Sequence, residues 1–147
     1  MENDNLKWTD VPEGWALCFN NECSLAETCL RRKAAQLAPE TLTVTRQVTP
    51  HAVKDGQCCH YASSEKVTFA RGFQHLYDKV LKAHYTSLRE SMTGMLSGKR
   101  IYYEYKRGER RLSPAQQEAI RDLFTSKGYA DSVVFDAFEE DYDFPWV

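Results

Sequence analysis

No apolar run in this sequence of 147 residues approaches the ~20 residues that a transmembrane helix needs. The first residues, Met-Glu-Asn-Asp-Asn, have neither the basic end nor the apolar centre of a secretory signal peptide. An excess of positive charge is also missing, because 19 Lys and Arg stand against 21 Asp and Glu. These absences predict a cytoplasmic protein with no membrane partner. They also exclude a strongly basic protein, which would bind nucleic acid through its overall positive charge.

The short motifs of several common chemistries are missing as well. The sequence has no Gly-rich phosphate-binding loop, no Gly-Lys-Ser/Thr, no His-Glu-x-x-His and no Gly-x-Ser-x-Gly. A cysteine nucleophile needs an imidazole close to its sulfur and a third group that orients the ring. The adjacency of Cys59 and His60 in the sequence does not create that geometry. We therefore favour a binding or regulatory module over an enzyme.

The sequence does contain enough apolar material for one folded domain. Hydrophobic residues make up 42% and aromatic residues 12% of the chain, and a chain of this length buries about 68–70% of its unfolded surface. We expect one α+β domain over residues 1–147, in which a short sheet packs against two or three helices. Within it, 1–62 would form a cysteine-rich, metal-binding lobe, and 63–147 a mixed helical body with an acidic C-terminal tail.

Local patterns predict the position of each element. Helices are predicted over 24–38, 64–76, 78–97 and 113–127, and strands over 41–49 and 100–106. Ser113-Pro114-Ala115-Gln116 combines an N-cap, a proline at the first helical position and a reciprocal glutamine. Ser24-Leu25-Ala26-Glu27 has the form of a capping box. The segment 100–106 has the tyrosine-rich composition of a strand.

The cysteines are the most informative feature, because all of them lie in the first 59 residues. They are Cys18, Cys23, Cys29, Cys58 and Cys59. Three surround the predicted start of the first helix, and the other two follow an Asp-Gly turn. The positive end of that helix would favour the thiolate form of Cys23, which is the form that binds metal.

Four thiolates are enough for a tetrahedral zinc site. We expect Cys18, Cys23, Cys29 and Cys58 as the ligands, with Cys59 or His60 as alternatives for the fourth position. The same spacing also fits an iron–sulfur cluster, a redox-active thiol pair or separate buried thiols. The zinc interpretation predicts a small binding or regulatory module, in which the metal is structural and the partner is another protein.

A basic, tyrosine-rich segment suggests a third possibility. Residues 99–111 carry six basic and two acidic side chains, and Arg107, Arg110, Arg111, Tyr103 and Tyr105 are candidates for binding single-stranded nucleic acid. Residues 128–147 hold six acidic side chains and no Lys or Arg. Pairing between the two segments would instead satisfy the basic side chains within the protein.

The order of several motifs is similar to that of a known family. They are Cys18-Phe19-Asn20, Cys23, Cys29-Leu30-Arg31-Arg32, Gly56-Gln57-Cys58, Lys66-Val67 with Phe69-Ala70, Tyr102-Tyr103 and the helix within 112–128. Over most of its length the chain resembles a family of small uncharacterised bacterial proteins, a domain of unknown function. The resemblance implies that the cysteine pattern is a family feature. It implies no activity and no catalytic residue.

Overall fold

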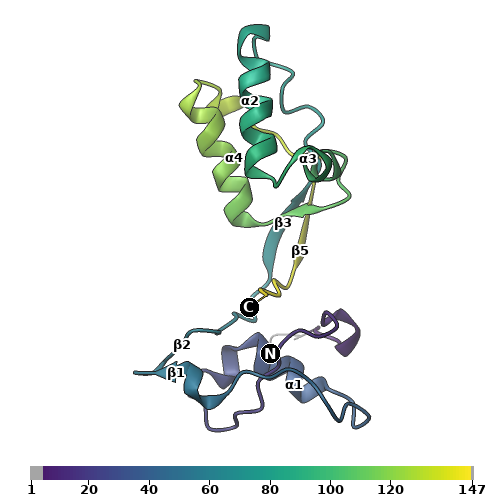
Figure 1. The fold of residues 1–147 in the computed structure, drawn as a ribbon, viewed down its shortest axis with the longest axis vertical. Helices are drawn as coiled ribbons and strands as arrows, with labels where there is room; N and C mark the ends of the chain where they lie inside the picture. Colours follow the sequence, from purple (N-terminus) through teal and green to yellow (C-terminus); the bar gives the residue numbers. More distant parts are fainter. Residues whose placement is uncertain (1–4, 147) are drawn as a thin grey trace. The chain divides into compact units, whose positions relative to one another are not determined.

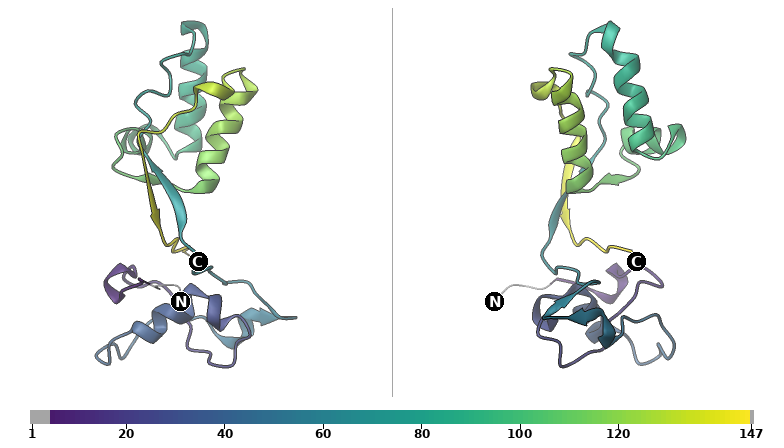
Figure 2. Two further views of the ribbon diagram at one scale, coloured as in Figure 1. Left: turned by 180° about the vertical axis from the view of Figure 1, so that it is seen from behind. Right: turned by 60° about the vertical axis from the view of Figure 1, so that its left-hand side comes forward.

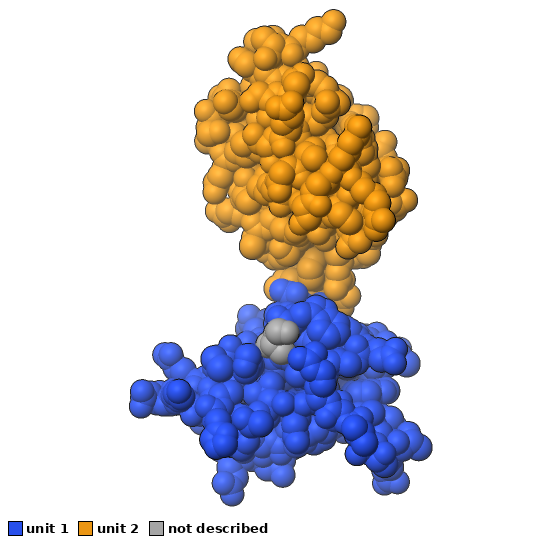
Figure 3. Space-filling view, in the orientation of Figure 1, with its two compact units in different colours: residues 1–66, 142–147 blue, residues 67–141 orange. Residues whose placement is uncertain are grey.

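The computed structural model describes residues 5–146 and contains helices together with short antiparallel sheets (Figure 1), so the predicted α+β class is confirmed. The chain divides into two compact units, which Figure 3 colours separately. Unit 1 comprises residues 1–66 and 142–147, and unit 2 comprises residues 67–141. The Met-Glu-Asn-Asp start and the final Val147 lie outside the described residues. No helix in the described part of the chain is long and apolar enough to cross a membrane.

Unit 1 has little regular structure. Its described residues contain one α-helix, α1 (Leu30–Leu37), and a two-stranded hairpin of β1 (Val53–Lys54) and β2 (Gln57–Cys58). The 3-10 turns η1 (Trp8–Asp10) and η2 (Ala26–Thr28) precede α1, and η3 (Pro50–Ala52) lies between α1 and β1. The predicted Asp-Gly turn closes the hairpin. Asp55 and Gly56 both have positive φ angles, of 52° and 75°, as a tight two-residue hairpin turn requires.

The core of unit 1 includes the C-terminal end of the chain. Its buried apolar residues are Leu6, Trp15, Leu17, Leu30, Ala34, Ala35, Ala62 and Tyr142. The ring of Phe144 meets Trp15 edge-on, with a centroid distance of 5.0 Å. The C-terminal segment 142–146 is therefore a structural part of the same unit as the N-terminal 66 residues.

Unit 2 is built on an antiparallel sheet with the strand order β4-β3-β5. The strands are β3 (Val67–Arg71), β4 (Arg111–Leu112) and β5 (Ala137–Asp141). Its helices are α2 (Lys82–Met95), α3 (Lys99–Lys106) and α4 (Pro114–Ser126), followed by the 3-10 turn η4 (Ala130–Ser132). Both views in Figure 2 show α2 and α4 side by side. The central apolar side chains of this unit include Phe73, Leu88, Met92, Tyr102 and Phe124, all fully buried.

A glycine after β3 is required by its surroundings. Gly72 has a φ of +77°, and a Cβ on it would lie 3.1 Å from Cγ and 3.2 Å from Cβ of Asp136. The close approach allows Asp136 N to donate a hydrogen bond of 2.9 Å to Gly72 O. A side chain here would have both an unfavourable backbone angle and a steric clash.

Two of the predicted helices are present where local signals were strongest. The helix predicted over 78–97 is α2, and the one predicted over 113–127 is α4. The capping box of α4 is formed, because Ser113 Oγ accepts from Gln116 N at 3.2 Å and Ser113 N donates to Gln116 Oε1 at 2.9 Å. The helix predicted to start at Ser24 is displaced: 26–28 form only η2, and α1 begins at Leu30 with Cys29 as its N-cap.

Three other predictions were wrong. The segment 64–76 contains β3 and turns, because pairing with the distant β4 and β5 overrides the ambiguous local pattern. The segment 100–106 is α3, in which Tyr102 lies inside the core with its ring 5.5 Å from that of Phe73. The segment 41–49 has no partner strand beyond an isolated bridge between Leu17 and Gln47, so it forms no strand.

Candidate metal centre

Two of the predicted ligands come from the irregular chain before α1. Cys18 follows the bridged Leu17, and its backbone N–H donates to Arg31 O at 3.2 Å. Cys23 lies in the turn before η2, where its carbonyl accepts from Ala26 N at 3.1 Å. The helix begins later than expected, so the residue at its N-terminus is Cys29 and not Cys23. Cys23 is therefore not at the positive end of the helix, where the sequence had placed it.

The other two predicted ligands come from regular elements. Cys29 is buried, as its place in the predicted apolar pattern required, and its backbone forms an isolated bridge with Ser63. Cys58 ends β2 opposite Val53, and its carbonyl accepts from Tyr61 N at 3.2 Å. Four cysteines that are up to 40 positions apart in the sequence are thus placed by four different local structures.

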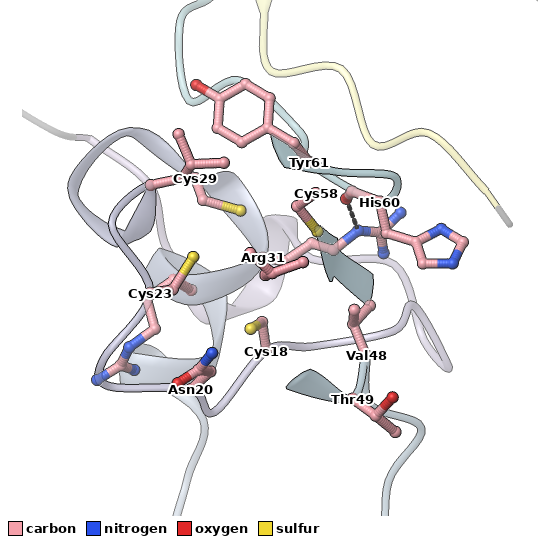
Figure 4. Close-up of a pocket in the computed structure, with 13 residues that line it drawn as sticks. Cys18, Asn20, Cys23, Cys29, Arg31, Val48, Thr49, Cys58, His60 and Tyr61 are labelled. Carbon is pink, nitrogen blue, oxygen red and sulfur yellow. Dashed lines mark hydrogen bonds between the residues drawn. The ribbon is translucent and has the colours of Figure 1, made fainter. Parts of the chain in front are cut away.

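These four cysteines line one pocket. Figure 4 shows the sulfur atoms of Cys18, Cys23, Cys29 and Cys58 pointing toward the same space. Leu25, Val48 and Val53 are among the apolar residues that complete its wall. The cavity has a volume of about 20 Å³, which is room for roughly one water-sized sphere. The structure thus brings together the set of thiols that the sequence singled out.

The two alternative ligands are placed differently. Cys59 is exposed and does not line this pocket. The imidazole of His60 points away from the four sulfur atoms in Figure 4, and the carbonyl of this residue accepts from Arg31 Nε at 2.8 Å. His60 therefore faces the pocket mainly with its backbone.

All five cysteines are free thiols. Among residues 5–146, no three His, Cys, Asp or Glu side chains stand close enough together to hold a metal ion. A Zn–S bond is about 2.3 Å long, so coordination requires the thiols around the pocket to draw closer.

Arg31 lies directly beside the thiols, and our sequence analysis assigned it no role. Its side chain is only 2% exposed, and its guanidinium donates to three backbone carbonyls. These are Ala16 O at 2.7 Å, His60 O at 2.8 Å and Pro145 O at 2.9 Å. The guanidinium also stacks on the Trp15 ring, with Cζ 4.4 Å from the centroid. Its place in the sequence, two residues after Cys29, is the signal that could have identified it.

The charge of Arg31 has unusual partners. Within the described residues, no Asp or Glu forms an ion pair with it. Burial, with a smaller contribution from the nearby charge of Arg46, lowers the pKa of Arg31 below its ordinary value, and thiolates at Cys29, Cys58 and Cys18 would act in the opposite direction. The groups able to balance this buried cation are therefore the thiols of the pocket.

The basic segment of unit 2 is largely engaged within the protein. Arg111 pairs with Asp141 at 2.7 Å, Arg107 with Glu109 at 2.9 Å, and Arg110 with Glu104. The pair at Arg111 joins the basic segment to the acidic tail. Tyr103 and Tyr105 are partly buried and pack against the core of unit 2. The five candidate nucleic-acid residues thus all have structural contacts.

Comparison with curated proteins and with solved structures finds no match. A family model does match, and it covers residues 1–144, which include unit 2, all but the last three residues of unit 1 and all four thiols of the pocket. The chain belongs to DUF6078, a family of unknown function.

Proposed function

We propose that unit 1 is a metal-binding module in which Cys18, Cys23, Cys29 and Cys58 hold one structural zinc ion. The observation that carries this proposal is the convergence of the four thiols on one pocket. The protein would act in the cytoplasm, where thiols stay reduced, as a binding or regulatory module for another protein.

A structural metal would suit the way unit 1 is built. The regular structure of its described residues consists of an eight-residue helix, a hairpin of two-residue strands and short 3-10 turns. A small unit with so little regular structure gains stability from a supplement, and a structural metal is one of the usual ones. An ion bound by thiols from four segments would cross-link the irregular chain before α1 to the hairpin.

The size of the pocket favours a single ion. Its volume of about 20 Å³ suits one ion that draws the thiols inward, whereas an iron–sulfur cluster brings several iron and sulfide atoms and needs more space. Zinc also suits four thiolates, because it accepts tetrahedral sulfur coordination without redox chemistry. The iron–sulfur alternative predicts a different colour and metal content, so one measurement separates the two.

The first experiment is metal analysis of the full chain purified without oxygen. We expect a colourless protein with about one zinc per chain. A brown protein containing iron would replace zinc with the cluster. Protein that is folded and binds neither metal, even after zinc is added, would contradict the proposal.

Two matched serine variants test the ligand set. Cys23→Ser should lose zinc and lower the free energy of unfolding of unit 1 by about 4 kcal/mol or more, because metal binding and folding are coupled. Cys59→Ser is the control, because Cys59 is exposed and lies outside the pocket. It should keep one zinc and its stability. Zinc content and urea unfolding measure both effects, and equal zinc content in the two variants would rule out Cys23 as a ligand.

A further inference from the structure

Arg31 contacts both the thiol pocket and the C-terminal segment. One face of the residue lines the pocket together with the four cysteines. Its Nη2 donates to Pro145 O at 2.9 Å, and the same carbonyl accepts from Trp15 Nε1 at 2.8 Å. The stacking of Arg31 on Trp15 and the edge-on contact between Trp15 and Phe144 complete this group. A single buried side chain thus contacts both ends of unit 1.

The charge of the pocket decides how stable this arrangement is. A buried guanidinium that donates only to neutral carbonyls retains an uncompensated charge, which is costly inside a protein. Four thiolates around a divalent ion carry a net double negative charge, and they would lie beside Arg31. Metal binding would therefore compensate the buried cation, and the cation would in turn stabilise the anionic metal site.

We propose that Arg31 is the internal counter-cation of the thiolate metal site and that it couples metal binding to the docking of the C-terminal segment 142–146. The proposal rests on the proposed function, because it requires the pocket to bind a metal. Arg31 acts as a positioning residue, because it contacts no metal itself. The negative charge of the metal site would hold the guanidinium in place, and the guanidinium holds the C-terminal segment through its hydrogen bond to Pro145 O. Docking and metal binding then favour each other to the same extent, as linkage requires.

The experiment measures zinc affinity in the full chain by competition with a chelator. A chain that ends at Phe144 lacks the Pro145 carbonyl, and we expect it to bind zinc at least about fivefold more weakly than wild type. Trp146→Ala is the matched control, because it removes the exposed ring of the same terminus and keeps that carbonyl. Its zinc affinity should equal that of wild type.

Substitutions of Arg31 separate charge from hydrogen bonding. Arg31→Met removes the charge and should weaken zinc binding about 10- to 100-fold, the range found for groups that support metal ligands. Arg31→Lys keeps the charge, but its single nitrogen cannot reach all three carbonyls that Nε, Nη1 and Nη2 of the arginine reach, so it should restore part of the affinity. Even with zinc bound, it should leave the Tyr142–Asp143 bond open to chymotrypsin. Arg107→Lys, at an arginine of unit 2 that pairs with Glu109 and lies outside the pocket, is the control and should change neither property.

The possible results distinguish failure of the proposed function from failure of this inference. Wild-type protein that binds no metal defeats the proposed function and this inference together. Wild-type protein that binds zinc, with affinities within about twofold for the shortened chain and for Arg31→Met, overturns only the inference. If an Arg31 variant does not fold, the shortened chain and its Trp146→Ala control still decide the result, because they leave Arg31 in place.

Discussion

Two tyrosines in unit 2, of which Tyr102 is buried and Tyr77 partly buried, form a pair of hydrogen-bonded hydroxyl groups. The hydroxyl groups of Tyr77 and Tyr102 are 3.0 Å apart and share a hydrogen bond. The ring of Tyr77 lies 5.1 Å from that of Tyr85 and 5.7 Å from that of Phe124. Burial, followed by the hydrogen bond with Tyr102, raises the pKa of Tyr77 above its ordinary value. Folding therefore keeps Tyr77 protonated.

This pair predicts a loss of stability in alkali. The folded pKa of Tyr77 exceeds the unfolded value, so its contribution is fully present below about pH 10 and is lost as the pH rises above it. Urea unfolding of unit 2 at about pH 8 and pH 11 should show a smaller loss of free energy in Tyr77→Phe than in wild type. Tyr61→Phe, an exposed tyrosine in unit 1, is the control. Equal losses in wild type and Tyr77→Phe would refute the prediction.

The thiol pocket also shows which of its residues could be predicted from the sequence by their type. The four cysteines were identified from their positions because few roles require clustered thiols. Arg31 was not identified in this way, because an arginine within a run of basic residues ordinarily lies on the surface. Its burial depends on carbonyls from Ala16, His60 and Pro145, which meet only in the folded chain.

Among the elements, α4 has the clearest local encoding. Its start carries a reciprocal cap between Ser113 and Gln116, and Gln117 is buried with its amide donating to Thr68 O at 2.9 Å and Leu112 O at 3.1 Å. The cap satisfies backbone N–H groups of the first turn, which otherwise have no partner within the helix.

Removing this cap should weaken unit 2. Ser113→Ala should lower the free energy of unfolding by about 1 kcal/mol, because the N–H of Gln116 loses its acceptor. Ser91→Ala, at an exposed position within α2, is the matched control and should change stability by no more than about 0.5 kcal/mol. Urea unfolding followed by circular dichroism measures both variants. A Ser113→Ala protein as stable as the control would show that the cap is not important.

The elements that sequence reasoning missed share a physical cause. The tyrosines of α3 favour a strand in isolation, yet packing of Tyr102 on Phe73 stabilises a helix. The pattern of 64–76 matches neither period, and β3 forms because it has partners on both sides. Conversely, 41–49 has strand composition without a partner strand. Pairing over long sequence separations, and not local propensity, decided all three.

At the scale of the whole molecule, unit 2 is an insertion within unit 1. The chain leaves unit 1 after Lys66 and returns at Tyr142. The ends of unit 2 are held together by the sheet, because Val67 and Asp141 are opposite each other in the antiparallel pair β3–β5. All buried members of its main apolar cluster lie between Ala70 and Phe124. Unit 2 therefore has a core and a sheet of its own.

This organisation predicts that unit 2 folds independently. A fragment of residues 67–141 should unfold in one cooperative urea transition and retain its helical circular dichroism, because its core and its paired ends are internal. The same fragment with Phe124→Ala is the control and should lose about 3–5 kcal/mol. A gradual, non-cooperative loss of signal from the unsubstituted fragment would show that unit 2 needs the rest of the chain.

The sequence by itself determined the α+β class, the helices α2 and α4, and the candidate thiols, because each depends on local spacing or on residue chemistry. Only the tertiary structure decided which strands pair, where α1 begins, and that Cys18, Cys23, Cys29 and Cys58 line one pocket. It also decided that Arg31 is buried beside them with a hydrogen bond to Pro145. The physical reason is that these features join segments far apart in the chain, and their energies arise only when those segments meet.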